Sequence, residues 1–144
     1  MRVFFDTSVL VPALVDQLSN HQASFALFSS LAHSNEHKTY CSTHTFAEMY
    51  SVLTSLPLPR RISSVEARML IEESIFKRLQ VVELGRKEYL DALENVSRRG
   101  LTSGIIYDAL HVEAAKEASC SRIYTYNIDH FEALAPESIT VSSP

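Results

Sequence analysis

Directly after Met1 the chain carries the stretch Arg2-Val3-Phe4-Phe5-Asp6-Thr7-Ser8, in which a short apolar run meets an acid and two hydroxyl residues. An apolar run of this length, followed by cap-forming residues, is typical of a strand that leads into a helix. We therefore predict a strand over Arg2–Asp6 and a helix behind it, with Thr7 or Ser8 as the helix cap.

The same order of strand and helix recurs along the rest of the chain. Short apolar runs predict further strands at Thr39–Cys41, Gln80–Leu84, Arg122–Tyr126 and Ser138–Val141. Helical spacing predicts one helix directly after the first strand and another directly after Ser42 and Thr43. It also predicts helices over residues 22–32, 63–79, 87–99 and 105–119, and a short turn or helix over residues 129–134. Because strands that alternate with helices need crossover connections, we expect an α/β fold, a three-layer α/β/α sandwich around a mostly parallel sheet.

Length and composition fit a single domain, residues 1–144, with a substantial core. Hydrophobic residues make up 46% of the sequence and charged residues 21%, which argues against a disordered chain. No apolar run approaches the roughly 20 residues that span a bilayer, and the first residues lack the pattern of a signal peptide. The two cysteines, Cys41 and Cys120, are too few for a disulfide framework. We expect a cytoplasmic protein without membrane contact.

The charge balance argues weakly against nucleic-acid binding. The net charge is −4, from 13 basic and 17 acidic residues, whereas phosphate contacts need Lys and Arg. The basic residues come in doublets, which fit solvated helix ends as well as a phosphate-binding surface. The doublets are Arg60-Arg61, Lys77-Arg78, Arg86-Lys87 and Arg98-Arg99. An acidic site that binds a cation would lower the net charge without excluding a polyanionic substrate.

Acidic and amide residues follow two of the predicted strands directly. In an open α/β sheet, ligands bind just beyond the carboxyl ends of the strands. Asp6 ends the first strand, and Asn127 and Asp129 follow the fourth, so we expect these side chains at that crevice. Each also has a local alternative, since Asp6 could serve only as a helix cap, and the other two could form an ordinary turn.

Two further acids lie on predicted helices. Asp108 lies near the start of its helix between apolar residues, where a solvated acid is unexpected, although the helix dipole also favours an acid there. Glu48 lies off the apolar stripe of its helix and need not enter the core. The run from Thr45 to Glu48 also fits a capping box, but Ser42 and Thr43 are available as earlier caps.

Carboxylates gathered in this way predict a divalent-metal site. Acids within about 4–6 Å of one another repel, which raises one or more pKa values, and a divalent cation removes the repulsion. Carboxylate oxygens and water suit Mg²⁺ or Mn²⁺, whereas zinc prefers His and Cys. Because such an ion activates water and offsets charge on a phosphate, Asp6, Glu48 and Asp108 predict hydrolysis of a phosphodiester.

Four segments that contain these acids follow one another from residue 2 to about residue 132. They are Val3-Phe4-Phe5-Asp6-Thr7-Ser8, Thr43-His44-Thr45-Phe46-Ala47-Glu48-Met49-Tyr50, Gly104-Ile105-Ile106-Tyr107-Asp108-Ala109-Leu110 and Tyr124-Thr125-Tyr126-Asn127-Ile128-Asp129-His130-Phe131. In this order and spacing, the chain resembles the PIN-domain nucleases, and within them the VapC-type toxins of bacterial and archaeal toxin–antitoxin pairs. One segment alone would be weak, whereas four in order make the resemblance specific.

The resemblance implies a Mg²⁺-dependent endoribonuclease, with Mn²⁺ as a substitute ion. Asp6 and Asp108 would hold the metal, and Glu48 would complete the acidic cluster. Many PIN domains have Asp where this chain has Asn127, although toxins of this type often carry Asn, and Asp129 is an alternative for this fourth position. The resemblance also implies an RNA substrate, a homodimer and a cognate antitoxin that blocks the pocket with a basic side chain.

The main alternative is a PIN-like module that binds RNA or a protein partner without cleaving it. Asn127 leaves this alternative open, whereas Asp6, Glu48 and Asp108 together favour the enzyme.

Several aromatic and histidine side chains are interpreted as packing residues. Tyr107 and His111 flank Asp108 on its helix, and we expect them to pack and not to act as acid–base groups. Helical spacing predicts that a further set belongs to the core: Phe25, Phe28, Phe46 and Tyr50.

Overall fold

The computed structural model describes residues 1–144 as five strands, seven α-helices and one π-helical segment. The strands are β1 (Arg2–Phe5), β2 (Lys38–Ser42), β3 (Gln80–Val82), β4 (Arg122–Tyr124) and β5 (Thr140–Ser142). The helices are α1 (Thr7–Leu14), α2 (His21–Ala32), α3 (Thr43–Ser55), α4 (Ser64–Leu70), the π-helical η1 (Ile71–Phe76), α5 (Arg86–Arg98), α6 (Ile105–Glu117) and α7 (Ile128–Leu134). None of the helices combines the length and hydrophobicity needed to cross a membrane.

All strand pairs of the sheet are parallel, and the strand order is β3-β2-β1-β4-β5. The chain builds outward from β1 to β2 and β3, and then crosses back to place β4 on the other side of β1. Such a reversal leaves a crevice at the carboxyl ends of the two central strands, because their connections leave in opposite directions. The register pairs Phe5 with Tyr124, so both strands end at the same level, immediately before Asp6 and Thr125.

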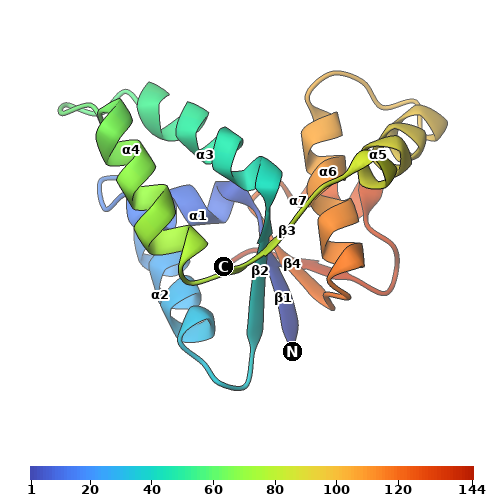
Figure 1. Ribbon diagram of the computed structural model, residues 1–144, viewed down its shortest axis with the longest axis horizontal. Helices are drawn as coiled ribbons and strands as arrows, with labels where there is room; N and C mark the ends of the chain where they lie inside the picture. The colour runs from blue at the N-terminus through green and yellow to red at the C-terminus, as the bar shows by residue number, and fades with distance from the viewer.

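Helices cover both faces of the sheet, which Figure 1 shows nearly edge-on. Helices α1 to α4 lie on one side, and α5 to α7 lie on the other. The side chains of β1 alternate between two cores: Val3 and Phe5 belong to the first and Phe4 to the second, and all three are fully buried. Because a covered parallel strand must be apolar on both faces, this run without polar alternation fits its place at the centre. The predicted three-layer α/β/α sandwich is confirmed.

Some local predictions differ from the structure. The helix expected over residues 63–79 becomes π-helical from Ile71 onward, and most strands are shorter than predicted at their carboxyl ends. The predicted cap of the first helix at Thr7 or Ser8 is wrong, because Asp6 occupies the N-cap position of α1. The strand therefore ends one residue before Asp6, and the chain turns into the helix at the acid itself.

The prediction that four aromatic residues belong to the core is wrong for two of them. Phe28 is buried and Phe46 is half-buried, but Phe25 is 50% exposed and Tyr50 is 42% exposed. Phe25 stacks on His21 at the surface, and Tyr50 lines an apolar groove between α3 and the α4–η1 helix. Helical spacing identifies residues that share a face, but it does not tell how much of that face the neighbouring helices cover.

Candidate active site

A pocket of about 420 Å³ opens at the carboxyl ends of β1 and β4, where the strand order reverses. Its volume lies in the range of ligand-binding pockets. Four of its lining residues are Asp6, Glu48, Asp108 and Asn127, which were predicted from the sequence. They come from the end of β1, from α3, from α6 and from the start of α7, so the crossover connections bring together residues that are far apart in the chain.

Hydroxyl groups hold Asp6 in place in this pocket. Asp6 is 2% exposed, and its Oδ2 accepts hydrogen bonds from Ser8 Oγ at 2.6 Å and Thr125 Oγ1 at 2.8 Å. The same two hydroxyl oxygens accept the backbone N–H groups of Tyr126 and Asn127, each at 2.9 Å. Although Asp6 stands at the N-cap position, its side chain makes no capping hydrogen bond. A capping role therefore does not account for this buried acid.

Replacement of Thr125 by valine keeps the shape of the side chain but removes its hydroxyl group. Asp6 would lose one of its two hydroxyl donors, and the N–H of Asn127 would lose its acceptor. We expect Mn²⁺ affinity to fall by about 10–100-fold and the free energy of unfolding to fall by about 1–3 kcal/mol. Calorimetric titration and urea unfolding measure the two effects. Thr125→Ser, which keeps the hydroxyl, should recover most of both, and equal losses in the two variants would contradict the role given to the hydroxyl group.

Two histidines face Glu48 from two helices. Glu48 Oε1 lies 3.3 Å from Nε2 of His111 on α6, and Oε2 lies 3.3 Å from Nε2 of His44 on α3. Burial alone would raise the pKa of Glu48, but its contacts with His111 and His44 outweigh burial and hold this pKa well below its usual range. The cap of α3 is Ser42, whose Oγ accepts the N–H of Thr45, so a capping box does not account for Glu48.

His111, which sequence analysis assigned to packing, is a member of this site. Its ring is fully buried, with Nδ1 at 3.2 Å from Ser42 Oγ and Nε2 at 3.9 Å from Asp6 Oδ1. Burial lowers the pKa of His111, but the hydrogen bond with Glu48 and the charges of Asp6 and Asp108 raise it more, so the net shift is upward. The raised pKa favours the imidazolium form, whose charge offsets part of the acidic charge. The sequence signal was the i, i+3 spacing of Asp108 and His111, which puts both on one face of a helix.

Asp108 lies in the first turn of α6 with its side chain 13% exposed, and its Oδ2 lies 2.8 Å from Nδ1 of His130. Burial raises the pKa of Asp108, and the negative charge of Asp6 adds to this rise, although the contact with His130 acts in the opposite direction. Asp6 and Asp108 therefore interact through their charges across the same pocket. When a second carboxyl group raises the pKa of a carboxyl group, a cation bound beside it stabilises the ionised form.

Asn127 lines the pocket, whereas Asp129 does not. Asn127 stands at the N-cap position of α7, but its side chain makes no capping hydrogen bond. Asp129 is exposed in the first turn of the same helix. The geometry therefore favours Asn127 over Asp129 as the fourth member of the acidic site, and leaves its amide group available to water or a phosphate.

The donor groups of the pocket fit a divalent cation. Asp6, Glu48 and Asp108 supply hard carboxylate oxygens, and the open pocket admits the water ligands that Mg²⁺ retains in proteins. The hydroxyl group of Thr7 lines the same pocket and is buried near Glu48, whose pKa it helps to lower, but it makes no hydrogen bond of good geometry. Clustered carboxylates and an unsatisfied buried hydroxyl would both gain partners from an ion with its water shell.

Comparison of the sequence with known proteins identifies close relatives. The family model of the PIN domain matches residues 3–135. Ribonuclease VapC27 of Mycobacterium tuberculosis (strain ATCC 25618 / H37Rv) is 35% identical over 112 residues, which are 78% of this chain and 75% of the relative. Ribonuclease VapC40 of Mycobacterium tuberculosis is 29% identical over 113 residues, which are 78% of each protein.

Solved structures with much lower sequence identity share the fold. VapC20 of Mycobacterium tuberculosis, a sarcin–ricin loop cleaving toxin, gives a TM-score of 0.72 at 17% identity, covering 94% of this chain and 97% of the other. VapBC2 from Rickettsia felis, bound to a DNA fragment from its promoter, gives 0.70 at 16% identity, covering 99% and 98%. At these identities the likeness concerns the fold alone. The family match and the sequence relatives show that this chain belongs to the PIN-domain family, among the relatives of the VapC ribonucleases.

Proposed function

We propose that this chain is a Mg²⁺-dependent endoribonuclease, the toxin of a VapBC-type toxin–antitoxin pair, which hydrolyses RNA phosphodiester bonds. The observation that carries the proposal is the presence of three carboxylates, Asp6, Glu48 and Asp108, on one pocket at the point where the strand order reverses. The sequence relatives VapC27 and VapC40 are ribonucleases, which supports RNA as the substrate.

Each residue of the pocket has a distinct role in this proposal. Asp6 and Asp108 hold the metal, with Asp6 oriented by its two hydroxyl donors. When bound, the divalent ion supplies Lewis-acid chemistry, which makes water a better nucleophile and offsets charge on the phosphate. Glu48 stays ionised beside His111 and completes the acidic cluster. The amide of Asn127 donates a hydrogen bond to a phosphate oxygen or a water molecule.

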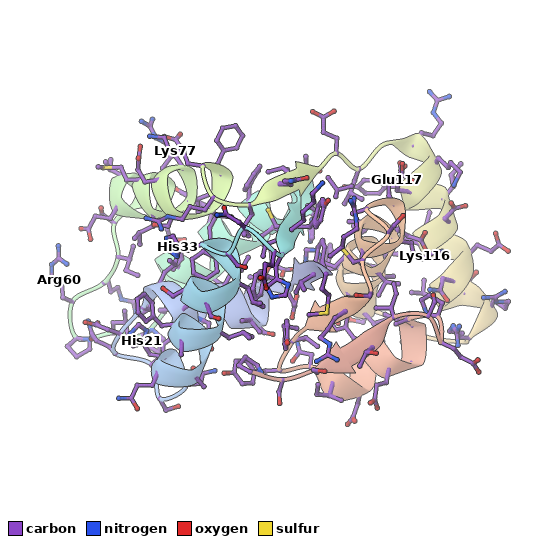
Figure 2. The ribbon with its side chains drawn as sticks, turned by 90° about the horizontal axis from the view of Figure 1, so that it is seen from below. His21, His33, Arg60, Lys77, Lys116 and Glu117 are labelled. Carbon is purple, nitrogen blue, oxygen red and sulfur yellow. The ribbon has the colours of Figure 1, made fainter.

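Exposed basic side chains supply weak contacts with the RNA backbone. Figure 2 shows Arg60 and Lys77 at the periphery of the molecule, well away from Lys116. Arg60 pairs with Glu66, and Lys77 pairs with Glu73, all on exposed surface. Exposed ion pairs of this kind contribute little to stability, so a phosphate group can replace the carboxylate at small cost.

A cognate antitoxin is the proposed protein partner. Similar structures include VapBC-5 from Mycobacterium tuberculosis, a member of the VapBC family of toxin–antitoxin systems. A pocket lined by Asp6, Glu48 and Asp108 is complementary to a basic side chain, which would compete directly with the metal. A homodimer and a cytoplasmic location are part of the same proposal.

The second candidate function is a PIN-like module that binds RNA or a protein without cleaving it. It is favoured by one observation, an uncharged Asn127 where a fourth carboxylate would strengthen metal binding.

A cleavage assay separates the two functions. Purified chain is incubated with structured RNA and Mg²⁺ or Mn²⁺, with and without excess chelator. The enzyme is expected to give discrete fragments that disappear with chelator, because the reaction needs the ion. RNA binding without any cleavage, in either metal, would favour the module.

A further inference from the structure

Two histidines and a carboxylate come together beside the acidic cluster with the spacing of a metal site. The ligand atoms of His44, Glu48 and His111 all lie within 4.8 Å of one another. One oxygen of Glu48 lies 3.3 Å from His44 Nε2, and the other lies 3.3 Å from His111 Nε2. Two donors that bind one zinc ion at roughly 2.05 Å with tetrahedral angles are about 3.3 Å apart. The two separations between Glu48 and the histidines therefore match those of zinc ligands, although they involve different oxygens of Glu48, and the full set needs an adjustment of at most about 1.5 Å from its limit of 4.8 Å.

Neighbouring side chains hold both imidazole rings in orientations that suit metal binding. The ring of His44 stacks on Tyr107, with centroids 5.1 Å apart and an interplanar angle of 11°. Nδ1 of His111 lies 3.2 Å from Ser42 Oγ, and a proton on Nδ1 leaves the lone pair of Nε2 free for a metal. His44 Nε2 is buried and, although it lies 3.3 Å from Glu48, it makes no aligned hydrogen bond. Such a nitrogen would gain a partner from a bound ion.

We propose that His44, Glu48 and His111 form a site for Zn²⁺, or an ion of similar softness, that shares Glu48 with the Mg²⁺ site. Imidazole nitrogens suit zinc, whereas Mg²⁺ prefers carboxylate oxygens and water. Asp6 Oδ1 lies 3.9 Å from His111 Nε2 and is available as a fourth ligand. The ligand types therefore favour zinc on the histidine side of Glu48 and Mg²⁺ on the side of Asp108.

Zinc at this site inhibits RNA cleavage, a consequence that rests on the proposed function. A zinc ion bound to Glu48 engages a carboxylate of the acidic cluster and places two positive charges close to Asp6. Both effects weaken the binding of Mg²⁺ in the neighbouring position. The nuclease therefore cleaves RNA with Mg²⁺ alone and is inactive when zinc is also bound.

Zinc binding by the metal-free full chain tests the site without any RNA. Competition with a chromophoric chelator, in excess Mg²⁺, is expected to give one Zn²⁺ per chain. His44→Phe keeps an aromatic ring on Tyr107 but removes one ligand, so the affinity should fall by about 100-fold or more. His33→Phe is the matched control at an exposed histidine that directly follows α2 (Figure 2), and it should bind zinc as the wild type does. X-ray absorption should report two imidazole ligands.

A second variant guards against a folding defect in His44→Phe. Glu48→Gln removes the shared carboxylate and should also weaken zinc binding, and melting curves show whether either variant is folded. The proposed zinc site would be refuted if both variants were folded and bound zinc with wild-type affinity. It would also be refuted if the wild type bound no stoichiometric zinc.

Cleavage in Mg²⁺ tests the inhibition, with each protein compared with its own zinc-free rate. Zinc should inhibit the wild type and His33→Phe at the concentrations that fill the site, and His44→Phe only at about 100-fold higher concentrations. Zinc that binds without slowing cleavage overturns the inhibitory role. A wild type that binds zinc as expected but cleaves no RNA in Mg²⁺ overturns the proposed function and supports the zinc site.

Discussion

Asp108→Asn is expected to reduce Mg²⁺-dependent RNA cleavage by at least about 1000-fold, because it removes a carboxylate proposed to bind the metal directly. Loss of a residue that only orients a ligand already costs about 10–100-fold, so the loss of a ligand should cost more. Asp6→Asn should have an effect of similar size, and the double variant should be little worse than either one, since both act through the same ion. Initial rates of RNA cleavage over a range of Mg²⁺ concentrations measure the three losses.

Stability measurements separate this loss of activity from a folding defect. In the metal-free protein, burial and the charge of Asp6 raise the pKa of Asp108, so the ionised side chain destabilises the fold above that pKa. Asparagine removes the charge and can still accept a hydrogen bond from His130. Asp108→Asn should therefore melt at or above the wild type without metal, and gain less from added Mg²⁺. A variant that melts lower and responds normally to Mg²⁺ would assign Asp108 to the fold.

Asp129→Asn is the matched control for both substitutions. It makes the same chemical change two residues from Asn127, on an exposed position that does not line the pocket. Surface substitutions of this kind usually change stability by less than about 0.5 kcal/mol. Cleavage by Asp129→Asn should therefore stay within about twofold of the wild type. A large loss would favour Asp129 as the fourth member of the site in place of Asn127.

The polar residues of the pocket could be predicted because two of them directly follow strands of a parallel sheet. Asp6 and Asn127 follow the two central strands, and parallel strands present their carboxyl ends at one edge of the sheet. Glu48 and Asp108 were harder to place, since an acid in the first turns of a helix also has a local explanation in capping or the helix dipole. The deciding fact is that α3 and α6 both begin at this edge.

The histidine partners of Glu48 could not be predicted in the same way. The contact between Glu48 and His111 depends on how α3 and α6 pack at the edge of the sheet, which is set by side-chain packing and not by the periodicity of either helix. Helix packing also explains why the prediction for Tyr50 was wrong. Its spacing predicts a core position, but the neighbouring helix leaves that part of α3 uncovered. Sequence patterns define faces of helices, whereas the pairing of faces is a property of the whole fold.

The second large effect concerns His111 itself. In the metal-free protein, the raised pKa of His111 favours its imidazolium form, which lies 3.3 Å from Glu48 and 3.9 Å from Asp6. His111→Leu keeps an apolar volume against Phe4 but leaves these carboxylates without that counter-charge. We expect the free energy of unfolding at about pH 6 to fall by roughly 3 kcal/mol, the low end for a broken buried pair, because Glu48 is 24% exposed. Added Mg²⁺ should stabilise the variant more than the wild type, since the ion replaces the missing charge.

The pH dependence distinguishes this electrostatic role from simple packing. The pKa of His111 is raised in the folded state, so its contribution to stability is complete below its unfolded pKa of about 6.5 and is lost as the pH rises through the folded pKa. The pKa of Glu48 is lowered, so its contribution is present above about 4.3 and is lost as the pH falls through the folded value. Urea unfolding in excess chelator should therefore show the largest difference between wild type and His111→Leu between about pH 4.5 and 6.5, and a smaller one near pH 9. An equal difference at both ends would mean that the imidazole ring only fills space.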